Sequence, residues 1–126
     1  MNPRVKSLWL EALRSGQYNY GRLRIRQTHD GTVQHCVLGV LADLYCKETG
    51  KDFAALFGGE ADDAVVLPDE VFEWAEIGQY MEEPLDGIPF DFDAPELWLG
   101  EYISALNDET IHGNYDLAAK FIEGHV

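Results

Sequence analysis

The first run of apolar residues predicts a helix close to the start of the chain. Between residues 5 and 13, apolar side chains recur every three or four positions, so they share one face of a helix. Asn2 can cap this helix, Pro3 suits its first position, and Ser15-Gly16 ends it. We therefore expect the first helix to pack an apolar stripe against the rest of the protein.

The apolar period then changes to two residues over residues 18–28, which is typical of a strand. Large polar side chains take alternate positions in this stretch: Tyr18, Tyr20, Arg22, Arg24 and Arg26. An Asp-Gly turn follows within residues 29–32, and residues 33–35 return as a short partner strand. A hairpin alone is marginally stable, so we expect one β-hairpin over residues 18–35 that lies on helices.

Residues 36–49 have a wide apolar face and predict the central helix of the fold. Gly50 follows as a stop signal. Gly39 lies in the middle of this helix, where glycine costs roughly 1 kcal/mol relative to alanine. That cost suggests that a neighbouring element approaches the helix closely at Gly39.

Four further helical segments complete the expected fold. They are a helical turn at 53–57, a helix at 69–77, a helix from Asp93 to about Leu106, and a last helix from about Asn114 to Gly124. No repeat or internal boundary is visible, so we expect a single domain over residues 1–126. The expected class is α+β and mainly α, with about five helices around residues 36–49 and one β-hairpin over residues 18–35.

Charge is distributed unevenly along the chain. Residues 1–51 hold eight of the nine Lys and Arg residues and only four acids, a net charge of +4. Residues 52–126 hold nineteen acids and one base, Lys120, a net charge of −18. The total of −14 has the wrong sign for binding nucleic acid or an anionic membrane. A positively charged partner would explain this excess, and so would a need for solubility.

The cysteines and the apolar runs indicate a cytoplasmic protein. Cys36 and Cys46 lie ten positions apart on the predicted central helix, which separates them by about 15 Å, too far for a disulfide. Free thiols are typical of reducing compartments. No apolar run approaches the ~20 residues that span a membrane, and the start of the chain lacks the apolar stretch of a signal peptide.

Five stretches of the sequence together resemble a family of small proteins of bacteriophages and their hosts. In this chain they read WLEALRSGQY at 9–18, CVLGVL at 36–41, LP with Val71 and Trp74-Ala75 at 67–75, LND at 106–108, and AAKFIE at 118–123. The stretches follow the family's order over most of the chain. The resemblance implies a compact helical domain with a small hairpin in a phage or prophage setting, and it implies no particular activity.

This chain departs from the family pattern at two places. Val37 stands where the family often has a second cysteine, which weakens the case for a thiol pair or a metal site. Residues 76–98 are unusually acidic, which suggests that the surface of this member is specialised. Many phage-encoded inhibitors of host defence, including anti-CRISPR proteins, are similarly small and acidic.

Thirteen acids within 37 residues form the main candidate for a partner-binding surface. They are Glu60, Asp62, Asp63, Asp69, Glu70, Glu73, Glu76, Glu82, Glu83, Asp86, Asp91, Asp93 and Glu96. Such carboxylates can occupy the basic groove of a nucleic-acid-binding protein, and they gain from long-range steering and from counterion release. A solvated acidic surface is the alternative interpretation. Divalent-ion binding is a third, although the acids lack the regular spacing of an EF-hand loop.

The alternating aromatic and basic residues of the predicted first strand form a second candidate site. They are Tyr18, Tyr20, Arg22, Arg24 and Arg26. Guanidinium groups on one strand face can meet phosphates, and the tyrosines can stack on a base, so a small-ligand or nucleotide-binding protein is the alternative function. The same arginines can instead pair with the acidic half of the protein or protect an edge strand from aggregation.

Cys36 is the candidate nucleophile. It lies at the start of the predicted central helix, where the helix dipole can lower a thiol pKa. His35 is adjacent, and His112 with Asn107, Asp108 or Asp116 to orient an imidazole could complete a Cys-His-Asn/Asp hydrolase. Cysteine is also among the most buried residue types and apolar residues follow it, so a packed, inert thiol is the favoured interpretation.

The expected function follows from these alternatives. We expect an acidic phage or prophage accessory protein, not an enzyme, that binds and inhibits a host defence protein by occluding its nucleic-acid-binding surface. The partner is then a host protein with a basic surface in the host cytoplasm, without direct contact to nucleic acid or membrane. The histidines lack ligand spacing, so we predict no metal and no cofactor. A small-ligand binder, or a Cys36-dependent hydrolase, remains the alternative.

Overall fold

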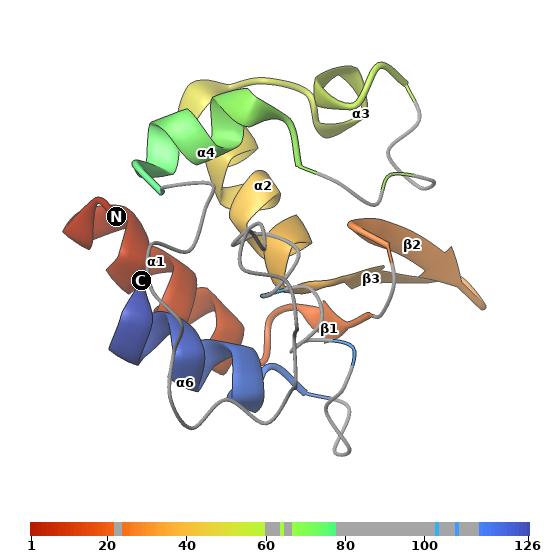
Figure 1. The fold of residues 1–126 in the computed structure, drawn as a ribbon. Coiled ribbons are helices and arrows are strands. Elements are labelled where there is room, and N and C mark those ends of the chain that lie inside the picture. Colours follow the sequence, from red (N-terminus) through yellow and green to blue (C-terminus); the bar gives the residue numbers. More distant parts are fainter. Residues whose placement is uncertain (22–23, 60–63, 65–66, 78–102, 104–107, 109–113) are drawn as a thin grey trace, which may run out of the picture.

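A computed structural model shows an α+β fold that is mainly helical, as the sequence predicts (Figure 1). The structure describes residues 1–21, 24–59, 64, 67–77, 103, 108 and 114–126. The elements within them, in chain order, are α1 (Pro3–Arg14), β1 (Asn19–Tyr20), β2 (Arg26–His29), β3 (Thr32–His35), α2 (Val37–Thr49), α3 (Phe53–Leu56), α4 (Asp69–Ala75) and α6 (Asp116–His125). Helix α2 is the centre, because α1, α3, α4 and β3 all contact it.

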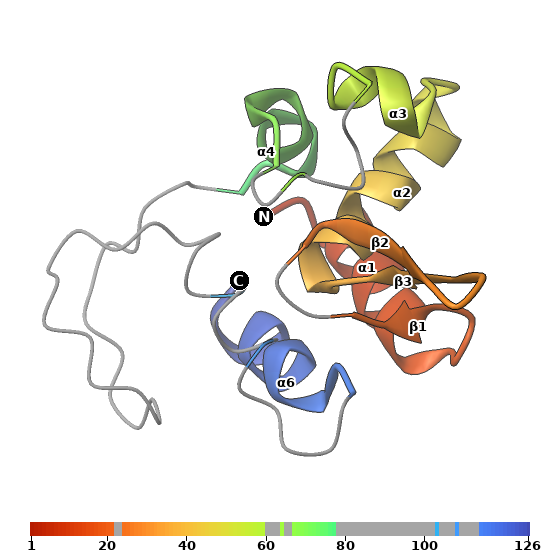
Figure 2. The same ribbon diagram turned by 90° about the vertical axis from the view of Figure 1, so that its right-hand side faces the viewer.

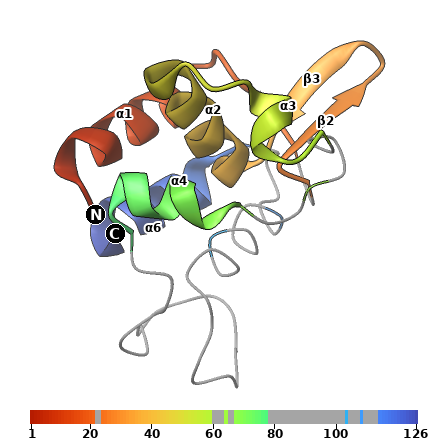
Figure 3. The ribbon, with the colours of Figure 1, turned by 90° about the horizontal axis from the view of Figure 1, so that it is seen from above.

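Elements from the two ends of the chain lie against each other. Helices α1 and α6 pack side by side, and the two termini lie close together (Figure 1). Figure 2 shows the three strands in the spatial order β1-β3-β2. The β2–β3 turn points away from the helices (Figure 3), so the sheet forms one end of the molecule.

The ends of α1 form as the sequence predicts. The Asn2 side-chain oxygen accepts hydrogen bonds from the backbone N–H groups of Arg4 (2.9 Å) and Val5 (3.3 Å). Pro3 lies in the first turn and Ser15 caps the other end. The predicted apolar stripe is buried through Val5, Trp9 and Leu13. The indole N–H of Trp9 also donates a hydrogen bond to the carbonyl oxygen of Val37 (3.0 Å), which ties α1 to the start of α2.

The predicted close approach at Gly39 is confirmed. A Cβ atom at Gly39 would lie 1.9 Å from the carbonyl oxygen of Ile25 and 2.9 Å from its carbonyl carbon. That carbonyl oxygen also accepts a hydrogen bond from the backbone N–H of Cys36 (3.2 Å), the residue that caps α2. Glycine is therefore required where the chain before β2 crosses the first turn of the central helix. Gly50, with φ 74°, ends α2 as predicted.

The predicted strand over residues 18–28 is interrupted. β1 pairs with β3 in parallel, the antiparallel hairpin consists of β2 and β3, and the turn between them uses Asp30 (φ 49°) and Gly31 (φ 79°). Ile25, which lies between β1 and β2, belongs to neither strand and is only 1% exposed. Its backbone N–H pairs with the carbonyl oxygen of Ala64 instead of a neighbouring strand (2.8 Å).

The remaining described helices agree with their predicted ranges within two residues. The helical turn is α3, the helix predicted at 69–77 is α4, and the last helix begins at Asp116 rather than near Asn114. Helix α4 ends at Glu76, which has a positive φ of 56°. The long connection predicted at 78–94 and the body of the helix predicted from Asp93 to Leu106 lie outside the described residues.

Candidate functional site

A pocket of about 450 Å³ opens beside β1, in the size range of small-molecule sites. It arises because β1 pairs only with the second half of β3, through Asn19 with Gln34 and Tyr20 with His35. The pocket lies beside the first half of β3 and the turn between β2 and β3. We name it the β1 pocket, and its lining residues are Gln17, Tyr18, Asn19, Gly31, Thr32, Val33 and His35.

Two aromatic rings in the lining of the β1 pocket belong to a row that continues into the core. Tyr18 meets His35 edge to face, with ring centroids 5.2 Å apart. His35 meets Phe53 in the same way at 6.0 Å. The guanidinium carbon of Arg26 lies 4.3 Å from the centre of the Phe53 ring, a cation–π contact that ends the row. These contacts fix the orientation of His35 between α3 and β1.

The hydroxyl of Tyr18 is held by an ion pair on α2. It donates a short hydrogen bond to the Asp43 carboxylate, and the Lys47 ammonium donates one to the hydroxyl oxygen (3.2 Å). Lys47 also pairs with Asp43 directly (3.1 Å). Burial and the Asp43 carboxylate together raise the pKa of Tyr18, so its hydroxyl stays protonated at neutral pH.

The imidazole of His35 is neutral at pH 7. Burial lowers the pKa of His35 below its usual 6.5, and the nearby charges of Arg26 and Lys47 lower it further against the opposing effect of Asp43. A neutral imidazole offers one hydrogen-bond donor and one acceptor. The backbone of His35 is also anchored, because its carbonyl oxygen accepts a hydrogen bond from the Tyr115 hydroxyl (2.6 Å).

The predicted tyrosine and arginine site is only partly brought together. Tyr18 lines the β1 pocket, whereas Tyr20 packs edge to face on Tyr115 with ring centroids 5.6 Å apart. Arg24 is exposed and precedes β2, and Arg26 begins β2 and covers Phe53. Neither of these arginines is among the lining residues of the pocket. Arg22 lies outside the described residues.

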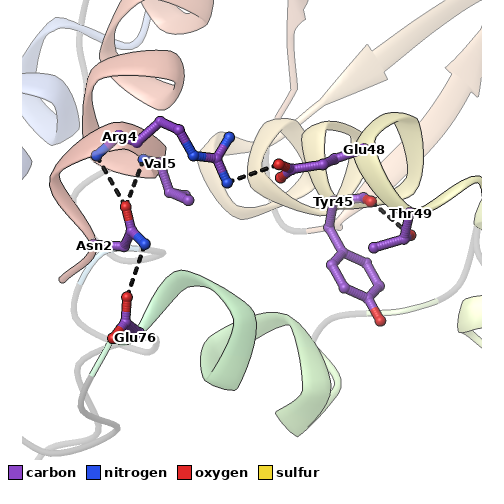
Figure 4. Close-up of polar contacts among 7 residues, drawn as sticks. All are labelled: Asn2, Arg4, Val5, Tyr45, Glu48, Thr49 and Glu76. Carbon is purple, nitrogen blue, oxygen red and sulfur yellow. Dashed lines mark hydrogen bonds and ion pairs between the residues drawn. The ribbon is translucent and has the colours of Figure 1, made fainter.

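Four of the thirteen predicted partner-binding acids lie on or beside α4. Glu70 binds the Lys51 ammonium (2.5 Å), which lowers the pKa of Glu70, and accepts a hydrogen bond from the Tyr45 hydroxyl (2.5 Å). Glu76 accepts a hydrogen bond from the Asn2 amide (2.8 Å; Figure 4). Asp69 and Glu73 are exposed. The other nine, which are Glu60, Asp62, Asp63, Glu82, Glu83, Asp86, Asp91, Asp93 and Glu96, lie outside the described residues.

Bases of the N-terminal half are paired within the fold. Figure 4 shows Arg4 of α1 reaching Glu48 of α2 (2.7 Å), and Arg14 binds Glu123 of α6. With the Lys47–Asp43 and Lys51–Glu70 pairs described above, these contacts join α1, α2, α4 and α6. Exposed pairs of this kind contribute little stability, so their main consequence is that these bases are already matched by acids.

The thiol of Cys36 is packed rather than reactive. Cys36 is 5% exposed, and its sulfur accepts a hydrogen bond from the backbone N–H of Gly39 (3.4 Å). Burial raises the pKa of this thiol to about 11, so it is protonated at neutral pH and is a poor nucleophile. Of the residues proposed to assist it, His112 and Asn107 lie outside the described residues. Cys46 is also free and buried.

The described residues form neither a metal site nor a membrane-spanning helix. Among the described residues, no three His, Cys, Asp or Glu side chains gather in a way that could hold a metal ion. In the same part of the chain, no helix has the length and apolar character needed to cross a membrane.

Sequence reasoning missed most of the β1 pocket. Gln17, Asn19, Thr32 and Val33 were not predicted as site residues, and His35 was weighed only as a neighbour of Cys36 and as a metal ligand. Val33 is 43% exposed in the structure, and the sequence alone did not indicate that exposure. The pocket depends on where β1 begins to pair with β3, at Asn19 with Gln34, and the two-residue period does not specify that point.

Comparison with known proteins identifies a family but no activity. Residues 1–125 match the family described as Domain of unknown function (DUF8296). Neither a curated protein nor a solved structure matches the chain. The matched range includes every helix and strand described above, the β1 pocket and all thirteen acids of the predicted partner-binding set. The chain therefore belongs to the DUF8296 family.

Proposed function

We propose that this protein binds a host protein on a positively charged, nucleic-acid-binding surface and inhibits it by occluding that surface. In this proposal the protein acts without catalysis, in the cytoplasm of a bacterial host, as an accessory protein of a phage or prophage. The setting rests on the resemblance of five sequence stretches, and the mode of binding rests on charge.

The observation that carries the proposal is the number of acids that no base of the chain can neutralise. With 23 acids and nine bases, at least 14 negative charges have no compensating Lys or Arg charge however the chain is arranged. The ion pairs of Arg4, Arg14, Lys47 and Lys51 already use four of the nine bases. An acid excess of this size makes the folded chain repel itself, and a basic partner would relieve that repulsion and be steered toward it.

The partner-binding acids are assigned mainly by elimination. The residues that the structure describes hold twelve acids and eight bases, a net charge of −4, and the rest of the chain holds a net −10. Glu70 and Glu76 are engaged within the fold. Asp69 also has an interaction within the protein, so it is removed from the set together with Glu70 and Glu76. We therefore assign binding to Glu73 and the nine predicted acids outside the described residues.

The test is affinity capture from a nuclease-treated bacterial lysate with two variants of equal charge change. One variant neutralises three assigned acids (Glu82→Gln, Glu83→Gln and Asp86→Asn), and the other adds the same positive charge to α1 (Ser7→Lys and Glu11→Lys). Ser7 and Glu11 are exposed, so the control leaves the core intact. Losing three of the carboxylates that face a basic partner is expected to weaken its capture by about tenfold.

The control variant is expected to capture the same partner as the wild type. If both variants captured less partner to the same extent, only the net charge of the protein would matter. That result would contradict the assignment of binding to particular acids. Undiminished capture by the three-acid variant would contradict the proposal in the same way. A captured partner without a basic surface would contradict the inhibitory mechanism itself.

A further inference from the structure

The β1 pocket has the size and the lining of a small-molecule site. We propose that it binds an uncharged, planar nucleobase or nucleoside. The pocket lies in the N-terminal half of the chain, and its lining contains none of the acids assigned to partner binding. The inference is therefore independent of the proposed inhibitory function.

The aromatic walls of the β1 pocket are fixed before any ligand binds. The Tyr18 ring is held through its hydroxyl by Asp43 and Lys47, and the His35 ring is held against Phe53. None of these three anchoring residues belongs to the lining. A ligand ring that stacks in the pocket would thus find its contact surface already ordered, which reduces the entropic cost of binding. Aromatic side chains are the usual stacking partners of an unpaired base.

The polar groups of the lining suit the edge of a heterocyclic base. Gln17 and Asn19 each carry an amide, which presents a hydrogen-bond donor beside an acceptor, and Thr32 adds a hydroxyl. A side-chain amide can match the neighbouring donor and acceptor groups of a base edge. The Asn19 amide is held in place, because its nitrogen donates to the carbonyl oxygen of Val33 (3.2 Å). The exposed Val33 side chain adds an apolar contact for the ring.

The charges around the β1 pocket favour a base or nucleoside over a nucleotide. None of the seven lining residues is charged at neutral pH, since His35 is neutral there. No lysine or arginine belongs to the lining, so a phosphate would find no cationic side chain in it. The net charge of the whole chain, −14, opposes the approach of an anion at long range. The Lys47 ammonium lies 5.3 Å from the centre of the Tyr18 ring, and its charge is already paired with Asp43.

The proposal is tested by calorimetric titration of the full chain with adenosine, guanosine, cytidine, uridine and thymidine, and with their 5′-monophosphates. We expect at least one nucleoside to saturate the protein with a dissociation constant below about 1 mM, the range of a single well-lined pocket. We expect its monophosphate to bind at least about fivefold more weakly at low salt, because the phosphate adds repulsion without a partner. The Gln17→Ala and Thr32→Ala variants should each weaken nucleoside binding by about tenfold.

The two pocket variants are compared with a control variant and with the wild type. Gln17 and Thr32 are exposed, so their substitution leaves the core unchanged. The control is Ser7→Ala at an exposed position of α1, and this variant should bind like the wild type. The proposal is overturned if none of the five nucleosides saturates the protein. It is also overturned if the monophosphate binds as tightly as its nucleoside, or if both pocket variants bind as the wild type does.

Discussion

The substitution Gly39→Ala tests how the central helix is packed. Alanine is the better helix former by about 1 kcal/mol, so local propensity alone predicts that the variant is more stable. The structure predicts the opposite, because the new Cβ would lie 1.9 Å from the Ile25 carbonyl oxygen. An ordinary contact between carbon and oxygen needs about 3.3 Å, so the backbone at Ile25 would have to move by more than about 1 Å.

That movement would lower the free energy of unfolding in two ways. Ile25 is 1% exposed, and overpacking in a core typically costs about 1–3 kcal/mol. The hydrogen bond from the Cys36 N–H to the Ile25 carbonyl oxygen would be strained, a further loss of about 1 kcal/mol. After the gain in propensity is subtracted, Gly39→Ala should lower the free energy of unfolding by about 2 kcal/mol.

The assay is urea unfolding followed by tryptophan fluorescence, to which the buried Trp9 contributes. The matched control is Gly124→Ala in α6, where an added Cβ would meet no atom within 4 Å. This control gains helix propensity without the clash, so it should be as stable as the wild type or slightly more stable. A Gly39→Ala protein at least as stable as the wild type would refute the packing that we describe at Ile25.

Three further predictions follow from the site. Tyr115→Phe removes the hydroxyl that donates to the His35 carbonyl oxygen, so it should cost about 1–2 kcal/mol in urea unfolding, and an unchanged midpoint would count against that bond. Because burial lowers the pKa of His35, this residue takes up a proton at higher pH in the unfolded chain than in the folded chain. The free energy of unfolding should therefore fall as the pH decreases below 6.5. A His35→Gln variant should lose this part of the pH dependence, whereas His29→Gln at the exposed turn should keep it. The Cys46→Ser variant leaves Cys36 as the one thiol. Iodoacetamide should alkylate Cys36 about 100-fold more slowly than it alkylates an exposed thiol, because the pKa of Cys36 is raised to about 11. Rapid alkylation at pH 7 would revive the hydrolase alternative.

The elements that the sequence predicted well depend on signals from nearby residues. The cap at Asn2, the turn at Asp30-Gly31 and the stop at Gly50 each involve contacts within a few positions, and all three are found in the structure. Gly39 was informative for a different reason, since a glycine inside a helix is unfavourable unless something requires it. The sequence could thus locate the close approach, although it did not identify Ile25 as the neighbour.

The features that sequence reasoning missed depend on contacts between distant segments. The two-residue period continues through residues 21–25, yet Ile25 belongs to neither β1 nor β2, is buried in the core, and pairs its N–H with Ala64. For this reason the predicted alignment of Tyr18, Arg24 and Arg26 on a single strand is not found. The β1 pocket lies at the opposite end of β1, beside the Asn19–Gln34 pair where pairing with β3 begins.

The central claim, that acids of this chain occupy a nucleic-acid-binding surface, is tested most directly by competition. The measurement is the binding of labelled duplex DNA or RNA to the purified captured partner while this protein is titrated in. We expect that the nucleic acid is displaced completely with one protein bound per site, and that added salt weakens the competitor. A stable complex that holds the partner, the nucleic acid and this protein together would contradict occlusion of that surface.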